Sequence, residues 1–485
     1  MSRRKYTIPL IYATSFLFLF GETVQPAPRI AIYEAIVCKQ YYNSSSAGTH
    51  DCKAAPVQEE LALLGGLERL SILVPSVLAI PFAALADRHG HSFVLAVAMF
   101  GVVLEDAWPF VVTWFPGVFP IRLVWLHFVF SCVGGGFTTV VTLLHVIIAD
   151  VVSAEDRTRM FFRSRAAGVA ASMVGYATSG LMMRVDDYLP WAVGLLSLVL
   201  GTVAAAMIPN QTVEAWRKPV DAGEGNAGWK PNVTRTAKAL KDVGTLLLGN
   251  KQVVAMLVLV FLCQLGFDAG PLMLAIYVSK RFGWSFSDVS IHRDLGAAQG
   301  HALTPTLQAS FLNSLEMSVE LLMLVLFLPL LTATLPARFQ SLSPTMKDKQ
   351  VAGWSLLALA AGQLCLGFAP VAVVAILGVV ILAMGAGQDS LLRSLATEMV
   401  LARDISMIYS AITMLRAIGG SISGPIYAWL YAVGLRQKQE VWIGLPYMVA
   451  GVLFLVALGL LVGLEVPERE GYEAIGEQED DEARA

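Results

Sequence analysis

The sequence LADRHG, residues 85–90, joins two long apolar runs at 61–86 and 92–113. Each run has the roughly 20 mostly apolar residues that an α-helix needs to cross the hydrocarbon core of a bilayer. The polar segment between them contains an aspartate, an arginine and a glycine, which suit a tight turn at a membrane surface. This part of the chain therefore predicts two consecutive membrane-spanning helices.

Ten further apolar runs extend this pattern and fall into two groups. With the first two, the runs at 7–35, 121–149, 161–184 and 189–208 make a group of six. The runs at 252–280, 306–332, 352–368, 370–396, 408–432 and 441–464 make a second six. We therefore expect an all-α integral membrane protein with twelve transmembrane helices. The expected domains are an N-terminal six-helix bundle at 1–208, a cytoplasmic linker at 209–250, a C-terminal six-helix bundle at 251–464 and an acidic, disordered cytoplasmic tail at 465–485.

The composition agrees with a lipid environment. Of 485 residues, 56% are hydrophobic and 15% are charged, whereas soluble domains average about 45–50% and about 25%. The net charge of −3 does not indicate a nucleic-acid partner. The sequence contains no P-loop, HExxH, CxxC or GxSxG motif, so we expect neither an enzyme nor a bound cofactor or metal.

Lysine and arginine residues orient the predicted helices. They are more frequent in alternate loops, which places both termini in the cytoplasm, with Arg29 among the fewer outer cations. The outer loop at 36–58 then contains a glycosylation sequon at Asn43 together with Cys38 and Cys52. The two cysteines form a disulfide or remain free thiols, and the sequence does not decide between these. The membrane is the plasma membrane or an internal membrane.

The two groups of six resemble each other. GET before Pro26 and IAIY corresponds to GFDAGP before LAIY, which places Glu22 and Asp268 at matching positions. CVGGGFTT (132–139) corresponds to AMGAGQDS (383–390), and the segment at 149–162 to that at 397–410. Parallel repeats that hold a substrate between them near the midplane are a known transporter plan.

These features together resemble the major facilitator superfamily. Asp87, Arg88 and Gly90 match its loop signature G-x-L-x-D-R-x-G-R-[RK], whereas Ala83 replaces the first glycine and His91-Ser92 the basic pair. The segment RIAIYEAIVCKQYY (29–42) is similar to fungal members, and with its cysteine-bearing loop also to the proton-coupled folate transporter group. The resemblance covers about residues 7–464. It implies a secondary transporter that works by rocker-switch alternating access.

The resemblance gives the polar loops a gating role. Asp87, Arg88 and Gly90 would form contacts in one conformation and release them in another, although a well-capped polar loop is the simpler reading. Asp150, Arg157 and Arg159 belong to a second loop, expected at the inner mouth. The sequence GSISGP (420–425) is related to an antiporter motif, but it lies in the eleventh run rather than the fifth, and close helix packing also explains it.

Polar residues within the apolar runs are the candidate solute and coupling residues. A charge near the bilayer centre costs at least about 2.5–3.5 kcal/mol, so such residues need a cavity, a partner or a proton. In the superfamily the first, fourth, seventh and tenth helices line the cavity. That would place Glu22 opposite Asp268, with Gln388 and Asp389 nearby. Arg393 lies at i+4 from Asp389, so these two can pair.

Our hypothesis is that Asp268, Glu22 or Asp389 carries a coupling proton, against the alternative of permanently paired structural acids. Several residues are secondary candidates. Glu316 and Glu320 share one helix face, Arg416 is an anion contact or the partner of an acid on the eighth helix, and Glu68-Arg69 form a local pair. We interpret His127 as a packed polar residue rather than a proton relay.

The expected function is proton-coupled transport of a small solute by a monomeric membrane protein. The alternative is a receptor or sensor that keeps the fold without transport. The gate motif and the intramembrane carboxylates favour transport, because a sensor could lose both. The sequence does not name the solute, the direction of transport, or whether the proton moves with or against it.

Overall fold

The computed structural model describes residues 2–42, 51–151, 154–209, 251–269, 271–283, 309–323, 344–385, 387–400 and 405–465. These residues form helices joined by turns and short irregular segments. Each of the twelve predicted intervals contains helix. Eight of the described helical segments are long and apolar enough to cross a membrane, judged by length and composition. The protein is therefore an all-α integral membrane protein.

The N-terminal half, residues 2–209, supplies the first six predicted spans. Span one consists of α1 and α2, and span two of α3 and α4, with both spans interrupted by a single residue. Span four begins as a 3₁₀ helix. The bounds are α1 Ser2–Val24, α2 Pro26–Tyr41, α3 Ala55–Ser71, α4 Leu73–His89, α5 His91–Trp114, η1 Ile121–Leu126, α6 His127–Ser131, α7 Gly136–Val151, α8 Ala154–Met182 and α9 Tyr188–Met207.

The C-terminal half, residues 251–465, supplies the other six. Spans seven and ten are each made of two helices, and the last span begins as a 3₁₀ helix. The bounds are α11 Lys251–Phe267, α12 Pro271–Phe282, α13 Ala309–Leu322, α16 Pro344–Phe368, α17 Ala372–Ala383, α18 Gln388–Glu398, α19 Ile405–Leu435, η4 Glu440–Gly444 and α20 Leu445–Gly463.

Breaks in the helices occur at matching places in the two halves. Span one breaks before Pro26, and span seven breaks before Pro271. Span four breaks between Ser131 and Gly136, and span ten breaks between Ala383 and Gln388. A proline cannot donate the backbone hydrogen bond of a helix interior, which explains the first pair of breaks. These positions coincide with the repeated sequences.

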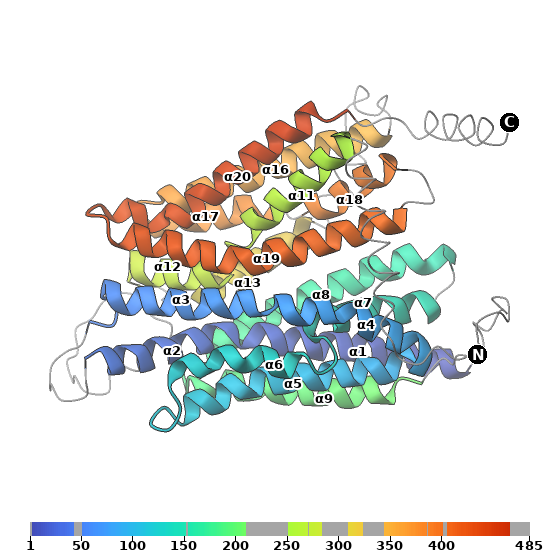
Figure 1. Ribbon diagram of the computed structural model, residues 1–485, viewed down its shortest axis with the longest axis horizontal. Helices are drawn as coiled ribbons and strands as arrows, with labels where there is room; N and C mark the ends of the chain where they lie inside the picture. Colours follow the sequence, from blue (N-terminus) through green and yellow to red (C-terminus); the bar gives the residue numbers. More distant parts are fainter. Residues whose placement is uncertain are drawn as a thin grey trace.

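The two halves form two layers that meet along α3 and α19 (Figure 1). Within the halves, α1 packs against α8 and α9, and α16 packs against α17 and α20. Between them, α13 packs against α8, and α12 against α2 and α3. The start of α1 and the end of α20 lie at the same end of the molecule, which we call the terminal end (Figure 1).

The opposite end, which we call the disulfide end, carries a disulfide between Cys38 and Cys52. The apolar core is arranged differently at the two ends. One cluster at the disulfide end contains side chains from both halves, such as Tyr33 and Tyr277. At the terminal end the N-terminal half has its own cluster around Leu95, and the C-terminal half has another around Leu359. Buried apolar surface therefore joins the halves at the disulfide end.

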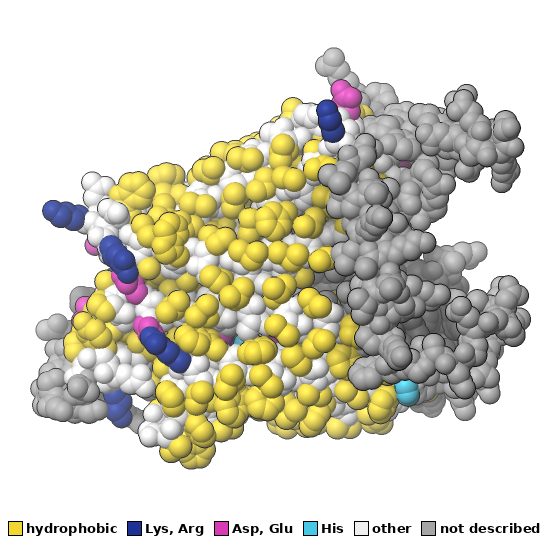
Figure 2. Space-filling view, in the orientation of Figure 1, with side chains coloured by type: hydrophobic (Ala, Val, Ile, Leu, Met, Phe, Trp, Pro, Cys, Tyr) yellow, Lys and Arg dark blue, Asp and Glu magenta, His cyan; other side chains and the backbone are white. Residues whose placement is uncertain are grey.

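The outer surface has the character of a lipid-facing surface. Many large apolar side chains are exposed, including Trp354, Trp429 and Val462. Figure 2 shows hydrophobic side chains spread over the visible face between the two ends, with most of the coloured lysine, arginine and acidic side chains at the disulfide end. A soluble surface rarely exposes so much contiguous apolar area.

Candidate functional site

A chain of polar side chains runs through the middle of the C-terminal half, and Gln264 of α11 is at its centre. Gln264 Nε2 donates a hydrogen bond to Asp268 Oδ2 at 2.7 Å. Gln264 Oε1 accepts one from Arg416 Nε of α19 at 2.8 Å. Gln264 was not among the predicted residues. A polar side chain one turn before Asp268, in an otherwise apolar run, was the available signal.

Three further predicted residues extend this chain into α18. The Arg416 guanidinium forms an ion pair with Asp389 Oδ1. Arg393 Nε lies 3.4 Å from the same oxygen, which is the predicted i,i+4 pair. Gln388 is buried beside them, and its Oε1 has no hydrogen-bond partner among the residues that the structure describes. These residues line a small cavity with Gln264. Arg416 was expected to contact an anion or to pair with an acid of the eighth span; among the described residues its guanidinium pairs with Asp389 of span ten.

Asp268 connects this chain to the N-terminal half. Its Oδ1 lies 3.6 Å from Arg69 Nη1 of α3, and its carboxylate packs beside Gly420 of α19. A continuous series of contacts therefore leads from α3 through Asp268 and Gln264 to Arg416. The predicted local pair of Glu68 with Arg69 is not formed between these neighbours, because Glu68 accepts a hydrogen bond from Tyr33 OH at 2.7 Å.

The α3–α19 contact beside Arg69 depends on two glycines. A Cβ atom placed on Gly424 would lie 2.5 Å from the Gly66 carbonyl oxygen and 2.5 Å from Arg69 Cβ. A Cβ on Gly66 would lie 2.8 Å from the Cβ of Ala428. The glycines of the GSISGP sequence therefore permit close packing of the two halves, which was the simpler of the two readings.

The N-terminal half holds a second polar cluster, built around Arg29. Arg29 Nη2 lies 2.6 Å from Asp106 Oδ1, and its guanidinium lies 5.2 Å from the centre of the buried Trp191 ring. Gln25 Nε2 donates to Asp106 Oδ2 at 3.1 Å. The assignment of Arg29 to an outer loop is wrong, because span one continues through α2 to Tyr41. The two acids of α5, Glu105 and Asp106, were missed despite lying within an apolar run.

Glu22 lies in α1 next to this cluster. The charged groups that interact with it are Asp106, Glu105 and Arg29. Among the described side chains, none forms an ion pair or a hydrogen bond with its carboxylate. Asp268 is paired with Arg69 and Gln264, and no contact between Glu22 and Asp268 is found among the described side chains. Tyr176 of α8 interacts electrostatically with both Glu22 and Arg69, so the expected position of Glu22 opposite Asp268 stays a prediction.

Glu105 takes part in a further set of contacts around His127, the first residue of α6. His127 Nδ1 lies 3.2 Å from Glu105 Oε1, and Nε2 lies 2.7 Å from Ser71 Oγ. Ser71 Oγ also donates to the Glu68 carbonyl oxygen at 2.6 Å. His127 is buried, and both ring nitrogens have partners.

The remaining predicted residues are placed as follows. Glu316 and Glu320 lie on α13, which packs against α8, where Ser314 Oγ donates to the Met173 carbonyl oxygen at 3.1 Å. Gly90 ends α4 with φ 98°, a backbone conformation that favours glycine. Asn43 and the side chains of Asp87, Arg88, Asp150, Arg157 and Arg159 lie outside the described part of the chain.

The backbone of the predicted inner-mouth loop is largely helical. Asp150 belongs to α7, and Arg157 and Arg159 belong to the first turns of α8. The loop was predicted from the end of the apolar run. Charged residues such as glutamate and arginine are good helix formers, so a helix can continue beyond the apolar part of a span.

Polar contacts also join the halves at the disulfide end. Lys53 Nζ forms an ion pair with Glu34 Oε1 at 2.6 Å and donates to Ser279 Oγ of α12 at 2.5 Å. The Lys53 carbonyl oxygen accepts a hydrogen bond from Lys280. Arg436 Nη2 pairs with Glu59 Oε2 at 2.8 Å. Lys53 directly follows Cys52, so the disulfide anchors the segment that bridges the two halves.

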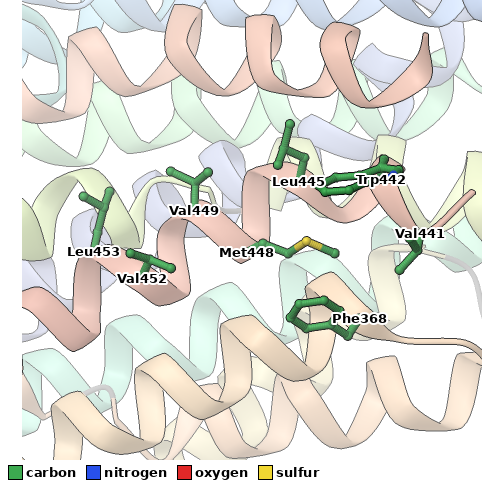
Figure 3. A pocket seen from close by; sticks show the side chains of 8 residues that line it. All are labelled: Phe368, Val441, Trp442, Leu445, Met448, Val449, Val452 and Leu453. Atoms are coloured by element: carbon green, nitrogen blue, oxygen red, sulfur yellow. The ribbon is translucent and has the colours of Figure 1, made fainter. Parts of the chain in front are cut away.

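An apolar pocket opens on the outside of the C-terminal half, along η4 and α20 (Figure 3). Eight apolar side chains line it, including Phe368, Trp442 and Met448. It has no polar group to orient a solute, and the surrounding surface is the exposed apolar one. We therefore assign it to the lipid-facing surface and not to the solute site.

Two helical bundles that enclose paired intramembrane charges define a membrane transporter of the six-plus-six type. Comparison with known proteins agrees with this class. Residues 58–298 match the family profile of the Major Facilitator Superfamily. The chain belongs to this superfamily and resembles its fungal members.

Curated relatives cover almost the whole chain. The MFS efflux pump atnC of Emericella nidulans is 27% identical over 95% of this chain and 88% of its own length. The efflux pump ustT of Aspergillus flavus is 29% identical over 90% of this chain and 83% of its own. The nucleoside transporter NupG superposes with a TM-score of 0.63 at 13% identity, covering 96% of this chain and 99% of its own. The D-xylose-proton symporter gives 0.61 at 15%, covering 96% and 98%. The solved structures show the shared fold.

Proposed function

We propose that this protein exports small organic molecules across its membrane in exchange for protons. The relatives named as efflux pumps support the direction of transport, because they match over nearly the full length of the chain. The observation that carries the proposal is a series of ion pairs and hydrogen bonds that crosses from one half to the other. It runs from Arg69 through Asp268 and Gln264 to Arg416 and Asp389.

The places where the halves touch support alternating access. The shared apolar cluster, the Lys53 bridge and the Arg436–Glu59 pair all lie at the disulfide end. The terminal end has separate clusters in the two halves. The positive-inside distribution assigns the terminal end to the cytoplasm. The described conformation is then the inward-facing one, and export requires the disulfide-end contacts to open.

Glu22 is the strongest of the three predicted proton carriers. Asp268 and Asp389 are each held by an arginine, so their charges are compensated within the protein. The Glu22 carboxylate has no such partner among the described residues and lies beside two other acids, Glu105 and Asp106. An acid in this position changes its protonation state more readily than a paired one. Glu22 would bind a proton in one conformation and release it in the other.

The test uses the full chain in proteoliposomes with an imposed pH gradient and a panel of amphipathic organic dyes, including rhodamine 6G. We expect dye to accumulate in vesicles with an acidic lumen and to leak out when a protonophore is added. Glu22→Gln should abolish gradient-driven accumulation but retain downhill exchange. Glu60→Gln is the matched control, because Glu60 is a carboxylate paired with Arg122 in an exposed position.

Two outcomes would contradict the proposal. If Glu22→Gln, Asp268→Asn and Asp389→Asn all left gradient-driven accumulation intact, none of these acids would be the coupling group. If no dye moved under any gradient while a dye still raised the melting temperature, binding without transport would favour the sensor.

A further inference from the structure

His127 and Glu105 make contacts whose hydrogen-bond roles are determined by their neighbours. The Ser71 hydroxyl donates its only proton to the Glu68 carbonyl oxygen. Ser71 Oγ must therefore accept from His127 Nε2 across the 2.7 Å contact, so Nε2 carries a proton. A neutral imidazole has only one N–H group. With Nε2 protonated, Nδ1 of a neutral His127 presents a lone pair to Glu105 Oε1, 3.2 Å away.

A lone pair facing a carboxylate oxygen at this distance is repulsive, so the contact needs one more proton. Either His127 is an imidazolium that donates to the Glu105 carboxylate, or Glu105 is a neutral acid that donates to Nδ1. Both arrangements contain the same proton between the same two atoms. We propose that His127 and Glu105 form a proton-binding site that holds one shared proton in the described conformation and releases it when the conformation changes.

The surroundings of the site favour a bound proton. Glu68 of α3, Asp106 of α5 and Arg29 of α2 interact electrostatically with the pair, and Glu22 of α1 and the Cys132 thiol interact with Glu105. The acids outnumber the single arginine, which is itself paired with Asp106. Release of the proton to water would leave an additional negative charge among these acids, and the low dielectric inside the protein makes that charge costly.

The site is connected to the inter-half bridge through the last turn of α3. Ser71 contacts His127, whereas Arg69, two residues earlier, contacts Asp268 of the other half. The helix ends at Ser71, and α4 starts at Leu73. When the proton leaves, His127 and Glu105 must separate or the imidazole must change tautomer. A change of tautomer reverses the hydrogen bond at Ser71, and a movement of His127 away from Glu105 removes it, so each of these disturbs the turn that carries Arg69. The inference thus deepens the proposed function by naming a second proton site for the same transport cycle.

The test counts protons released by the purified full chain in nanodiscs, with an indicator dye in weak buffer. The pH is raised from about 5 to about 9, a range that brackets the ordinary histidine value of about 6.5. A shared proton predicts that the double variant Glu105→Gln/His127→Gln releases one proton fewer than the wild type, because the pair holds a single proton in this range. Two independent groups would instead make the double variant lose two. Either that result or unchanged release in the double variant would overturn the proposal.

A second variant guards against effects of misfolding. Ser71→Ala retains both titratable groups but removes the acceptor that holds the proton on Nε2. A neutral His127 can then donate from Nδ1 to the Glu105 carboxylate. We expect the number of released protons to equal that of the wild type, with release at lower pH. Glu60→Gln serves as the control and should change neither quantity in this range. An unchanged release profile in Ser71→Ala would contradict the assigned hydrogen-bond roles.

The two proposals fail separately, because proton release is measured without a solute or a gradient. If the dye assay shows no proton-driven movement but the shared proton is found, proton-coupled export is wrong and the binding site stands. If transport is proton-driven but the double variant releases the wild-type number of protons, the site is wrong and the coupling stands.

Discussion

The contact between α3 and α19 leads to a specific prediction for Gly424→Ala. A Cβ atom at Gly424 would lie 2.5 Å from the Gly66 carbonyl oxygen, whereas ordinary van der Waals contact begins at 3.4 Å. The obstructing atom is backbone, so α3 and α19 must separate by about 1 Å at this point. Overpacking of this kind costs about 1–3 kcal/mol.

The cost applies only while the halves touch at this crossing. A second conformation in which α3 and α19 have moved apart would not bear it. The equilibrium should therefore shift away from the described conformation by about 5- to 150-fold. The matched control is Gly459→Ala in α20, where an added Cβ has no atom within 4 Å. That change should leave the equilibrium unaltered and improve helix propensity slightly.

The assay measures electron–electron distances between two pairs of spin labels. Val118 and Lys438 are exposed at the disulfide end, and Met207 and Val462 are exposed at the terminal end. In a background in which Cys132, Cys263 and Cys365 are replaced by serine, we expect Gly424→Ala to lengthen the first distance and shorten the second. Identical distributions for Gly424→Ala and Gly459→Ala would refute the reasoning, because the described crossing cannot accommodate the methyl group without moving α3.

Three further predictions concern stability, measured as melting of the purified protein in detergent. Reduction of the Cys38–Cys52 disulfide, which closes a separation of 14 residues, should lower the free energy of unfolding by about 3 kcal/mol, and an unchanged melting temperature would contradict this. Asp389→Asn leaves Arg416 and Arg393 without their carboxylate, so it should lower the free energy of unfolding by about 1–3 kcal/mol. This loss is smaller than for a fully buried pair because the pair is partly exposed to solvent. Adding Arg416→Gln should restore part of that loss, and an additive double variant would show that the pair is not coupled. Trp191→Ala should lower the free energy of unfolding by about 3–5 kcal/mol, because the ring is fully buried against Arg29. Trp191→Phe keeps an aromatic ring and should cost clearly less. Equal losses in the two variants would argue against a ring contact with the guanidinium.

The positions of the spans were predictable because membrane length limits the possibilities. Each predicted apolar interval contains helix among the described residues, since every backbone group in lipid must be bonded within its own helix. The breaks at Gln25 and near Asp268 were visible as repeated sequences, but the sequence does not show how the helix continues after each break. Span one continues past the break at Gln25, which moves Arg29 from a loop into the bundle.

The candidate site was predictable in part. The free-energy cost of a charge in lipid predicted three of its residues, which the structure brings together: Asp389, Arg393 and Arg416. Gln264 was not predicted, because burying an amide in an apolar run costs less free energy than burying a charge and so is a weaker signal. Glu105 and Asp106 lie within an apolar run like the predicted acids, so the cost of a charge in lipid indicates them equally. The bridge from Arg69 to Asp268 joins residues 199 positions apart, and no local pattern indicates such a partner.

The distribution of ion pairs has a consequence for how the protein is made. Arg29 and Asp106 belong to the same half, and so do Asp389 and Arg416, so each of these pairs can form as soon as its own half has entered the membrane. Arg69 and Asp268 are different, because one is inserted long before the other is synthesised. Until the second half docks, Arg69 has no such counter-charge and is costly to hold in lipid. Docking of the second half is then the step that supplies the counter-charge of Arg69, and a chain halted before span seven would expose an uncompensated arginine to membrane quality control.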